Sequence, residues 1–202
     1  MTLRSRRFDV SMQAGVEGNE RLTASNAVVL LVLLALEGAT LVAVRQLLVP
    51  HVFLGFLLIP PVALKLGSTG WRLLRYYRGS ESYVRRGPPH PLLRFVVAPL
   101  VVVSTVCLFA SGVAVVATGG HGLLLGLHQA SFFVWLGAMS VHVLWHVWKL
   151  PRLAFDRLPG RGLRLAAVGA ALGAGLVLAV STVPLADHWQ DRATRAFGVD
   201  RA

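Results

Sequence analysis

Long apolar stretches alternate along this chain with short segments that are rich in arginine. Five of the stretches are long enough to cross a bilayer, whose hydrocarbon core needs about 20 mostly apolar residues in helical form. They cover about residues 26–44, 50–66, 95–118, 123–147 and 163–184. The runs are continuous and lack the alternation of a barrel strand. The pattern therefore predicts an all-α integral membrane protein with five transmembrane helices.

The composition agrees with a membrane protein and excludes an ordinary soluble enzyme. Of the 202 residues, 55% are hydrophobic and 14% are charged, and the mean hydropathy is +0.64, whereas soluble domains are about a quarter charged. The single cysteine, Cys107, excludes an internal disulfide. Abundant Arg, Ala, Gly, Val and Leu are typical of a high-GC bacterial genome, so we expect a bacterial plasma membrane protein.

The net charge of +11 is concentrated in the segments that lie on one side of the predicted spans. Fifteen Lys and Arg residues fall before span one, between spans two and three, or between spans four and five, against four on the other side. This asymmetry places the N-terminus in the cytoplasm and the C-terminus outside. We interpret the charge as topology and attraction to anionic lipid, and expect no nucleic-acid partner.

These assignments give the expected organisation of the whole chain. Residues 1–25 form a polar cytoplasmic tail, 26–148 a four-helix bundle, 149–162 a basic cytoplasmic loop, 163–184 the fifth span and 185–202 an external tail. Pro60 and Pro61 predict a kink in span two. Small residues in span five favour close contact with another helix; they are Gly169, Ala170, Ala171, Gly173, Ala174 and Gly175.

The fourth span carries most of the candidate chemistry on one face. At 100° per residue, six of its residues fall within about 60° of one another: His121, His128, Trp135, Met139, His142 and His146. The opposite face contains Gly126, Ala130 and Gly137, which suits the close approach of a neighbouring helix.

A second helix supplies a histidine at the same depth as His128. His51 opens span two, which runs parallel to span four, so the two imidazoles can lie level. Fourteen residues further along each span, or about 21 Å along the axis, Lys65 is level with His142. Neutral imidazoles coordinate haem iron, and a flat macrocycle fits between helices. Only the His51–His128 pair has the two histidines that a bis-imidazole haem needs.

Two other interpretations of the histidines stay open. They can form a structural or proton-handling network between helices, or bind zinc or copper, which prefer three or four ligands; His142 and His146 supply two. Glu37 is the only acid within a span, where carboxylates are costly and often functional. It can accept a proton coupled to quinone chemistry, or pair with Lys65 or a histidine.

Two basic residues are further candidates. Lys65 can extend to lipid phosphate, bind a haem propionate, or, least expected, act as an axial ligand. Arg45, just outside span one, can neutralise propionates of the outer haem or anchor the chain at the membrane surface.

Several segments resemble a known family. They are the run from His51 to Gly55, the run from Pro60 to Arg72, Ser111–Gly112, Leu127–His128 and the run from Val141 to His146. Together they resemble small bacterial b-type cytochromes of the cytochrome b561-like group, which includes the haem-bearing membrane subunits of formate dehydrogenases and hydrogenases. The resemblance covers roughly residues 26–148.

The resemblance implies a bundle with two b haems that exchanges electrons with quinone. It assigns His51 and His128 as ligands of the outer haem, and His142 or His146 as candidates for an inner one. Because no inner histidine from another span faces His142, we expect one haem and leave the second open.

We therefore expect a membrane electron-transfer protein, which would be the cytochrome subunit of an oxidoreductase and not a complete enzyme. It would exchange electrons with quinone or a partner redox subunit. The alternative is a haem-free membrane scaffold or small transporter subunit whose histidines and Glu37 form a polar network. A third reading is a relative that kept the fold and lost the cofactor.

Overall fold

The computed structural model describes residues 3–85, 87, 90–119, 122–150 and 160–197, and no strand occurs among them. Five helices are long: α1 (Leu3–Thr40), α2 (Leu48–Tyr77), α4 (Ala98–Thr118), α5 (Leu123–His146) and α7 (Arg161–Phe197). Four short helical segments join them: η1 (Leu41–Ala43), α3 (Glu81–Val84), the π-helical η2 (Leu93–Val97) and η3 (Val147–Lys149). The five long helices provide five segments long and apolar enough to cross a membrane. The predicted all-α fold is confirmed, and it fits a multi-pass membrane protein.

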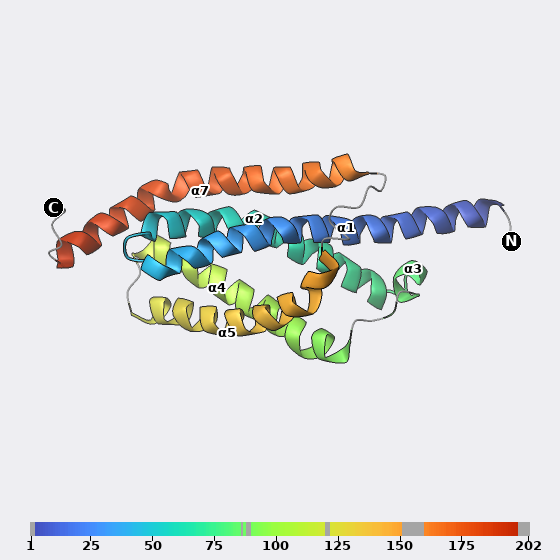
Figure 1. Cartoon of the computed structure of the whole chain (residues 1–202), viewed down its shortest axis with the longest axis horizontal. Coiled ribbons are helices and arrows are strands. Elements are labelled where there is room, and N and C mark those ends of the chain that lie inside the picture. Colours follow the sequence, from blue (N-terminus) through green and yellow to red (C-terminus); the bar gives the residue numbers. More distant parts are fainter. Residues whose placement is uncertain (1–2, 86, 88–89, 120–121, 151–159, 198–202) are drawn as a thin grey trace.

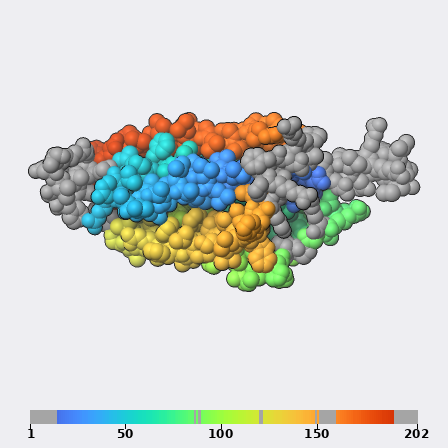
Figure 2. All heavy atoms as spheres, viewed as in Figure 1, coloured from blue at the N-terminus to red at the C-terminus, as the bar shows by residue number. Residues whose placement is uncertain are grey.

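The long helices form two layers (Figure 1). Helices α1, α2 and α7 pack side by side in one layer, and α4 pairs with α5 in the other. In the space-filling view α7 follows one long edge and α5 the other, with α1 and α2 between them (Figure 2). Contacts within each layer are far more numerous than contacts between the layers, which are mostly made by α4 with α2 and α7.

Successive helices run in opposite directions, so the molecule has two distinct ends (Figure 1). At one end, which we call the basic end, α2 ends and α7 begins, and it carries Arg72, Arg75, Arg78, Arg85 and Arg94. At the opposite end η1 leads into α2, and Trp189 of α7 donates a hydrogen bond of 2.6 Å to the carbonyl oxygen of Gly119, where α4 ends. Helix α1 starts at the basic end and α7 finishes at the opposite end.

The structure corrects the predicted ends of several helices. Residues 3–25, expected as a polar tail, continue α1, and α2 and α7 extend past the predicted limits at residues 66 and 184. Polar residues of this segment form hydrogen bonds with α2. Asn19 Nδ2 donates to the Ser68 carbonyl oxygen at 2.9 Å, and Thr23 Oγ1 donates to Ser68 Oγ at 2.9 Å. The polar residues near the start of α1 therefore mark the end of its apolar segment, and the helix itself continues through them.

Helix α1 is also fixed to the middle of α2. Asn26 is fully buried, and its Nδ2 donates to the carbonyl oxygen of Pro61 at 2.7 Å. Helix α2 passes through Pro60 and Pro61 as one continuous helix. Proline lacks an amide N–H, so Pro61 leaves the carbonyl of Leu57 without its intrahelical donor.

Gly175 of α7 lies against that carbonyl. A Cβ atom at Gly175 would be 2.4 Å from Leu57 O, so only glycine allows the two backbones this close. The Cα–H bond in the Cβ direction can contact the freed oxygen. The predicted close packing of α7 is therefore confirmed at Gly175.

The other small residues of span five are not buried within the described part of the chain, so their close contact with a helix of another chain stays a prediction. Gly169, Ala170, Gly173 and Ala174 of α7 are exposed, and Ala171 is only half-buried. On α5 the glycine and alanine face is also exposed, while Ser131, Trp135 and Ala138 are buried. Lipid and protein interiors are similarly apolar, so small residues alone do not determine which face is covered.

The Gly175 contact yields a stability prediction. We expect Gly175→Ala to destabilise the protein by about 1–3 kcal/mol, as overpacking does, because the new methyl group would meet a backbone oxygen. Gly173→Ala is the matched control, since a Cβ there has nothing within 4 Å and alanine favours helix. Thermal unfolding in detergent, followed by circular dichroism, compares the two. Equal melting temperatures would contradict the proposed close contact.

Candidate functional site

His51 lies in the first turn of α2 and is held by residues at the end of α1. Its Nδ1 is 3.0 Å from Glu37 Oε1 and 2.9 Å from Thr40 Oγ1. The Thr40 hydroxyl donates to the Glu37 carbonyl oxygen at 2.6 Å, so it can only accept from the imidazole. Both neighbours therefore favour a hydrogen on Nδ1, which leaves Nε2 with a free lone pair.

His128 of α5 is held in the same way by α4. Its Nδ1 is 3.1 Å from the Leu108 carbonyl oxygen and 3.3 Å from Ser111 Oγ. Ser111 donates to the Leu108 carbonyl oxygen at 3.0 Å, so its oxygen also acts as an acceptor toward the ring. His128 thus presents a lone pair on Nε2 as well.

Gly112 makes the position of His128 sterically possible. A Cβ atom at Gly112 would lie 3.0 Å from His128 Cε1 and 3.3 Å from its Nδ1. Any larger residue would push the imidazole away from α4. The glycine is therefore part of the site, although it has no functional group.

The two imidazoles meet between the layers. Their ring centres are 6.5 Å apart and their planes are inclined by 78°. Within the described chain, neither Nε2 makes a hydrogen bond. The backbones of α2 and α5 hardly approach each other, so the contact is made by side chains that extend across the space between the helices.

This separation fits two ligands of one metal ion. Imidazoles on opposite sides of a metal, with metal–nitrogen bonds of about 2.0–2.1 Å, have ring centres roughly 6 Å apart. Metal-binding histidines generally donate their other N–H to a carboxylate or a carbonyl oxygen, which fixes the ring. Glu37 and Leu108 occupy those positions here. His51 and His128 therefore have the donor atoms and the supporting contacts that a bis-imidazole site requires.

Glu37 is the most unusual member of the site. Of the partners expected for it, the structure selects His51, with which it forms the 3.0 Å contact. Its second oxygen, Oε2, is buried and makes no hydrogen bond within the described part of the chain. An unsatisfied buried acceptor is costly, so this carboxylate is fixed to the imidazole at the expense of stability.

The inner candidates are not assembled into a similar pair. Lys65 Nζ donates to the Thr23 carbonyl oxygen of α1 at 3.0 Å. The nearest ring to His142 is His146 of the same helix, with ring centres 4.6 Å apart. His146 Nδ1 is bonded to the His142 carbonyl oxygen at 2.9 Å. No group of three or more His, Cys, Asp or Glu able to hold a metal occurs among the described residues.

The remaining candidates lie apart from the histidine pair. Arg45 is exposed in the turn that precedes α2, and His121 lies outside the described residues. Trp135 and Met139 share the inward side of α5 with His128, and Trp135 Nε1 donates to Thr105 Oγ1 of α4 at 3.0 Å. Sequence reasoning missed Thr40 and the carbonyl of Leu108. The three-residue spacing from Glu37 is the only signal that could have indicated Thr40.

The similarity of this chain to known proteins was tested in three ways. Neither the protein-family models, nor the curated proteins, nor the solved structures give a match to it.

Proposed function

We propose that this protein carries electrons in the membrane and holds a b-type haem between α2 and α5, with His51 and His128 as axial ligands. One observation carries the proposal. The two rings are 6.5 Å apart and come from different layers, and each Nδ1 is bound to its own layer. A structural histidine pair does not need this arrangement, whereas two ligands of one iron do.

The sparse contact between the layers also supports the proposal. The backbones of α2 and α5 hardly approach each other, and a haem bound between two helices holds their backbones apart. When bound, haem would supply reversible one-electron transfer. The chain would bind and orient it: Glu37 and Thr40 hold His51, and Leu108 and Ser111 hold His128. Arg45 near the opposite end is the candidate partner for the propionates, and quinone or a redox subunit would exchange the electrons.

The two ligands differ in the charge of their supporting acceptor. His51 faces a carboxylate, whereas His128 faces a neutral carbonyl and a hydroxyl. A charged acceptor makes the imidazole a stronger ligand. We therefore expect His51 to depend on Glu37 more than His128 depends on Ser111.

The first prediction concerns the ligands. Protein expressed in haem-replete cells should give a b-type reduced-minus-oxidised spectrum with about one haem per chain. His51→Ala and His128→Ala should each abolish that band. His90→Ala is the control, because His90 packs on Trp145 and lies away from the pair. A normal spectrum in both ligand variants would refute the assignment, and two haems per chain would indicate an inner ligand and make Lys65 the next residue to replace.

The second prediction concerns Glu37. Glu37→Ala should weaken haem retention about 10–100-fold, the usual effect of removing a group that orients a metal ligand. Glu37→Gln should have a smaller effect, since an amide oxygen still accepts a hydrogen bond. Haem transfer to apomyoglobin measures the loss, with Glu81→Gln as the control because Glu81 is exposed on α3 and pairs with Arg85. Unchanged retention in Glu37→Ala would show that the carboxylate does not support the ligand.

One observation favours the alternative of a haem-free membrane scaffold or transporter subunit. The Nδ1 atoms of both rings already have hydrogen-bond partners without a cofactor. Protein that contains no haem after expression in haem-replete cells would select this alternative. The histidines and Glu37 would then act as a polar contact between α1, α2, α4 and α5.

A further inference from the structure

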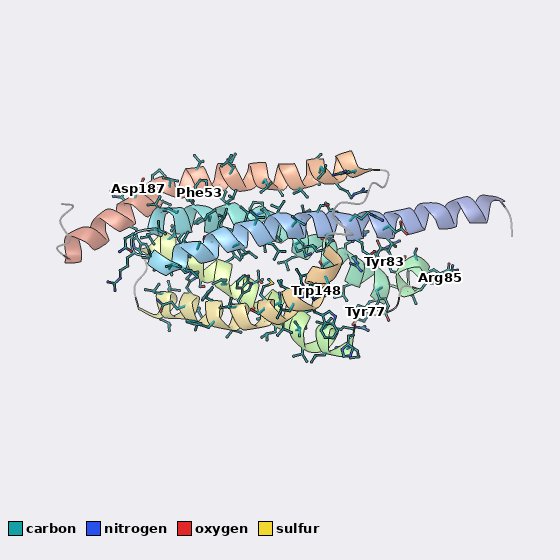
Figure 3. All side chains as sticks on the ribbon, in the orientation of Figure 1. Phe53, Tyr77, Tyr83, Arg85, Trp148 and Asp187 are labelled. Carbon is teal, nitrogen blue, oxygen red and sulfur yellow. The ribbon has the colours of Figure 1, made fainter. Side chains whose placement is uncertain are left out.

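A second group of side chains lies at the basic end, away from the histidine pair. Figure 3 shows Tyr77, Tyr83 and Arg85 gathered at this end, and Phe53 and Asp187 at the other. The group combines two arginines, Arg75 and Arg94, with aromatic rings from α2, α3 and η2. The function proposed above does not use it.

Arg94 is enclosed by aromatic rings. Its guanidinium carbon lies 4.8 Å from the ring centre of Tyr77, 5.0 Å from that of Phe95 and 5.1 Å from that of Tyr76. Its Nε donates to the Tyr77 hydroxyl at 3.0 Å. Such contacts orient a planar guanidinium and leave its positive charge in place.

Arg75 has a similar environment in the last turn of α2. Its guanidinium carbon is 5.7 Å from the ring centre of Trp71 and 6.0 Å from that of Tyr83 on α3. The rings therefore hold two guanidinium groups at the same end of the bundle.

These two arginines differ from their neighbours in their ion-pair partners. Arg72 pairs with Glu20 at 3.3 Å, and Arg85 pairs with Glu81. In the described part of the chain neither Arg75 nor Arg94 has a carboxylate within ion-pair distance. An arginine that is oriented by rings and has no counter-charge is arranged to receive an anion from outside the chain.

The position of Arg94 identifies the source of that anion. It lies in the first turn of the apolar segment Leu93–Thr118, between the buried residues Leu93 and Val97. The neighbouring rings face outward: Phe95 is 66% exposed and Tyr77 is 59% exposed. Aromatic rings at the end of an apolar span lie at the level of lipid headgroups, where phosphate is the abundant anion.

We propose that Arg94 binds the phosphate of an anionic phospholipid, and that Arg75 adds positive charge at the same end of the bundle. The Arg94 guanidinium contacts the phosphate, and the exposed rings of Phe95 and Tyr77 lie beside the glycerol and the first methylenes of the acyl chains. Basic sites at the cytoplasmic surface of membrane proteins bind anionic lipids through this combination of charge and apolar contact. The site needs neither haem nor the histidine pair.

Native mass spectrometry of the full chain, titrated with phosphatidylglycerol or phosphatidylcholine, tests the proposal. We expect the wild-type protein to retain phosphatidylglycerol more strongly. Each arginine should contribute about fivefold to the affinity, so Arg75→Gln combined with Arg94→Gln should lose about 25-fold. Arg94→Lys should retain an intermediate affinity, because it keeps the charge and loses the planar contacts.

Arg85→Gln is the matched control, since it removes one positive charge at the same end from an arginine that already pairs with Glu81. It should bind phosphatidylglycerol as the wild type does, and circular dichroism confirms that each variant is folded. Equal binding of both lipids, or wild-type affinity in the folded double variant, would overturn the proposal. Displacement of the lipid by millimolar inorganic phosphate would also overturn it, because the site would then take a soluble anion.

Discussion

Two consecutive prolines in the middle of α2 impose a constraint that the packing of the first layer satisfies. A bilayer offers no water to a backbone carbonyl that has lost its intrahelical donor, so neighbouring helices must cover it. Gly175 brings α7 against the Leu57 carbonyl, which Pro61 leaves without a donor, and Asn26 fixes α1 to the same stretch of α2 by donating to the Pro61 carbonyl. With α1 and α7 fixed to its centre, α2 has a defined rotation. That rotation directs His51 toward α1 on one side and His128 on the other.

The sequence contains enough information to predict the number of spans and the level of the histidine pair. Five apolar runs gave five helices, and the parallel course of two of them brought His51 to the depth of His128. The helix ends were less predictable, because Asn19 and Thr23 are polar yet helical when α2 supplies partners. The buried face of each helix could not be predicted either, because a helix in lipid is apolar both on the side that faces lipid and on the side that faces protein. Thr40 has only its spacing from Glu37 as a local signature and Leu108 has none, because their roles depend on where another helix passes.

The two proposed sites use opposite solutions to the problem of charge in a membrane. At the histidine pair, the Glu37 carboxyl group is half-buried and is held 3.0 Å from one imidazole. At the basic end, Arg75 and Arg94 remain at the surface, where aromatic rings orient them and leave the counter-charge to lipid. The buried site favours one chemical partner at a fixed distance. The surface site accepts a mobile partner, a lipid that exchanges with the rest of the bilayer.

The two-layer arrangement has a consequence for assembly. Helices α4 and α5 form a hairpin that can insert as a unit, and it meets the other layer through few direct contacts. A ligand that binds both His51 and His128 therefore fastens one layer to the other, and mass action makes its binding free energy part of the folding free energy. If haem is that ligand, as proposed above, its supply in the cell would set how much of the chain reaches its final fold and would therefore regulate the abundance of the protein.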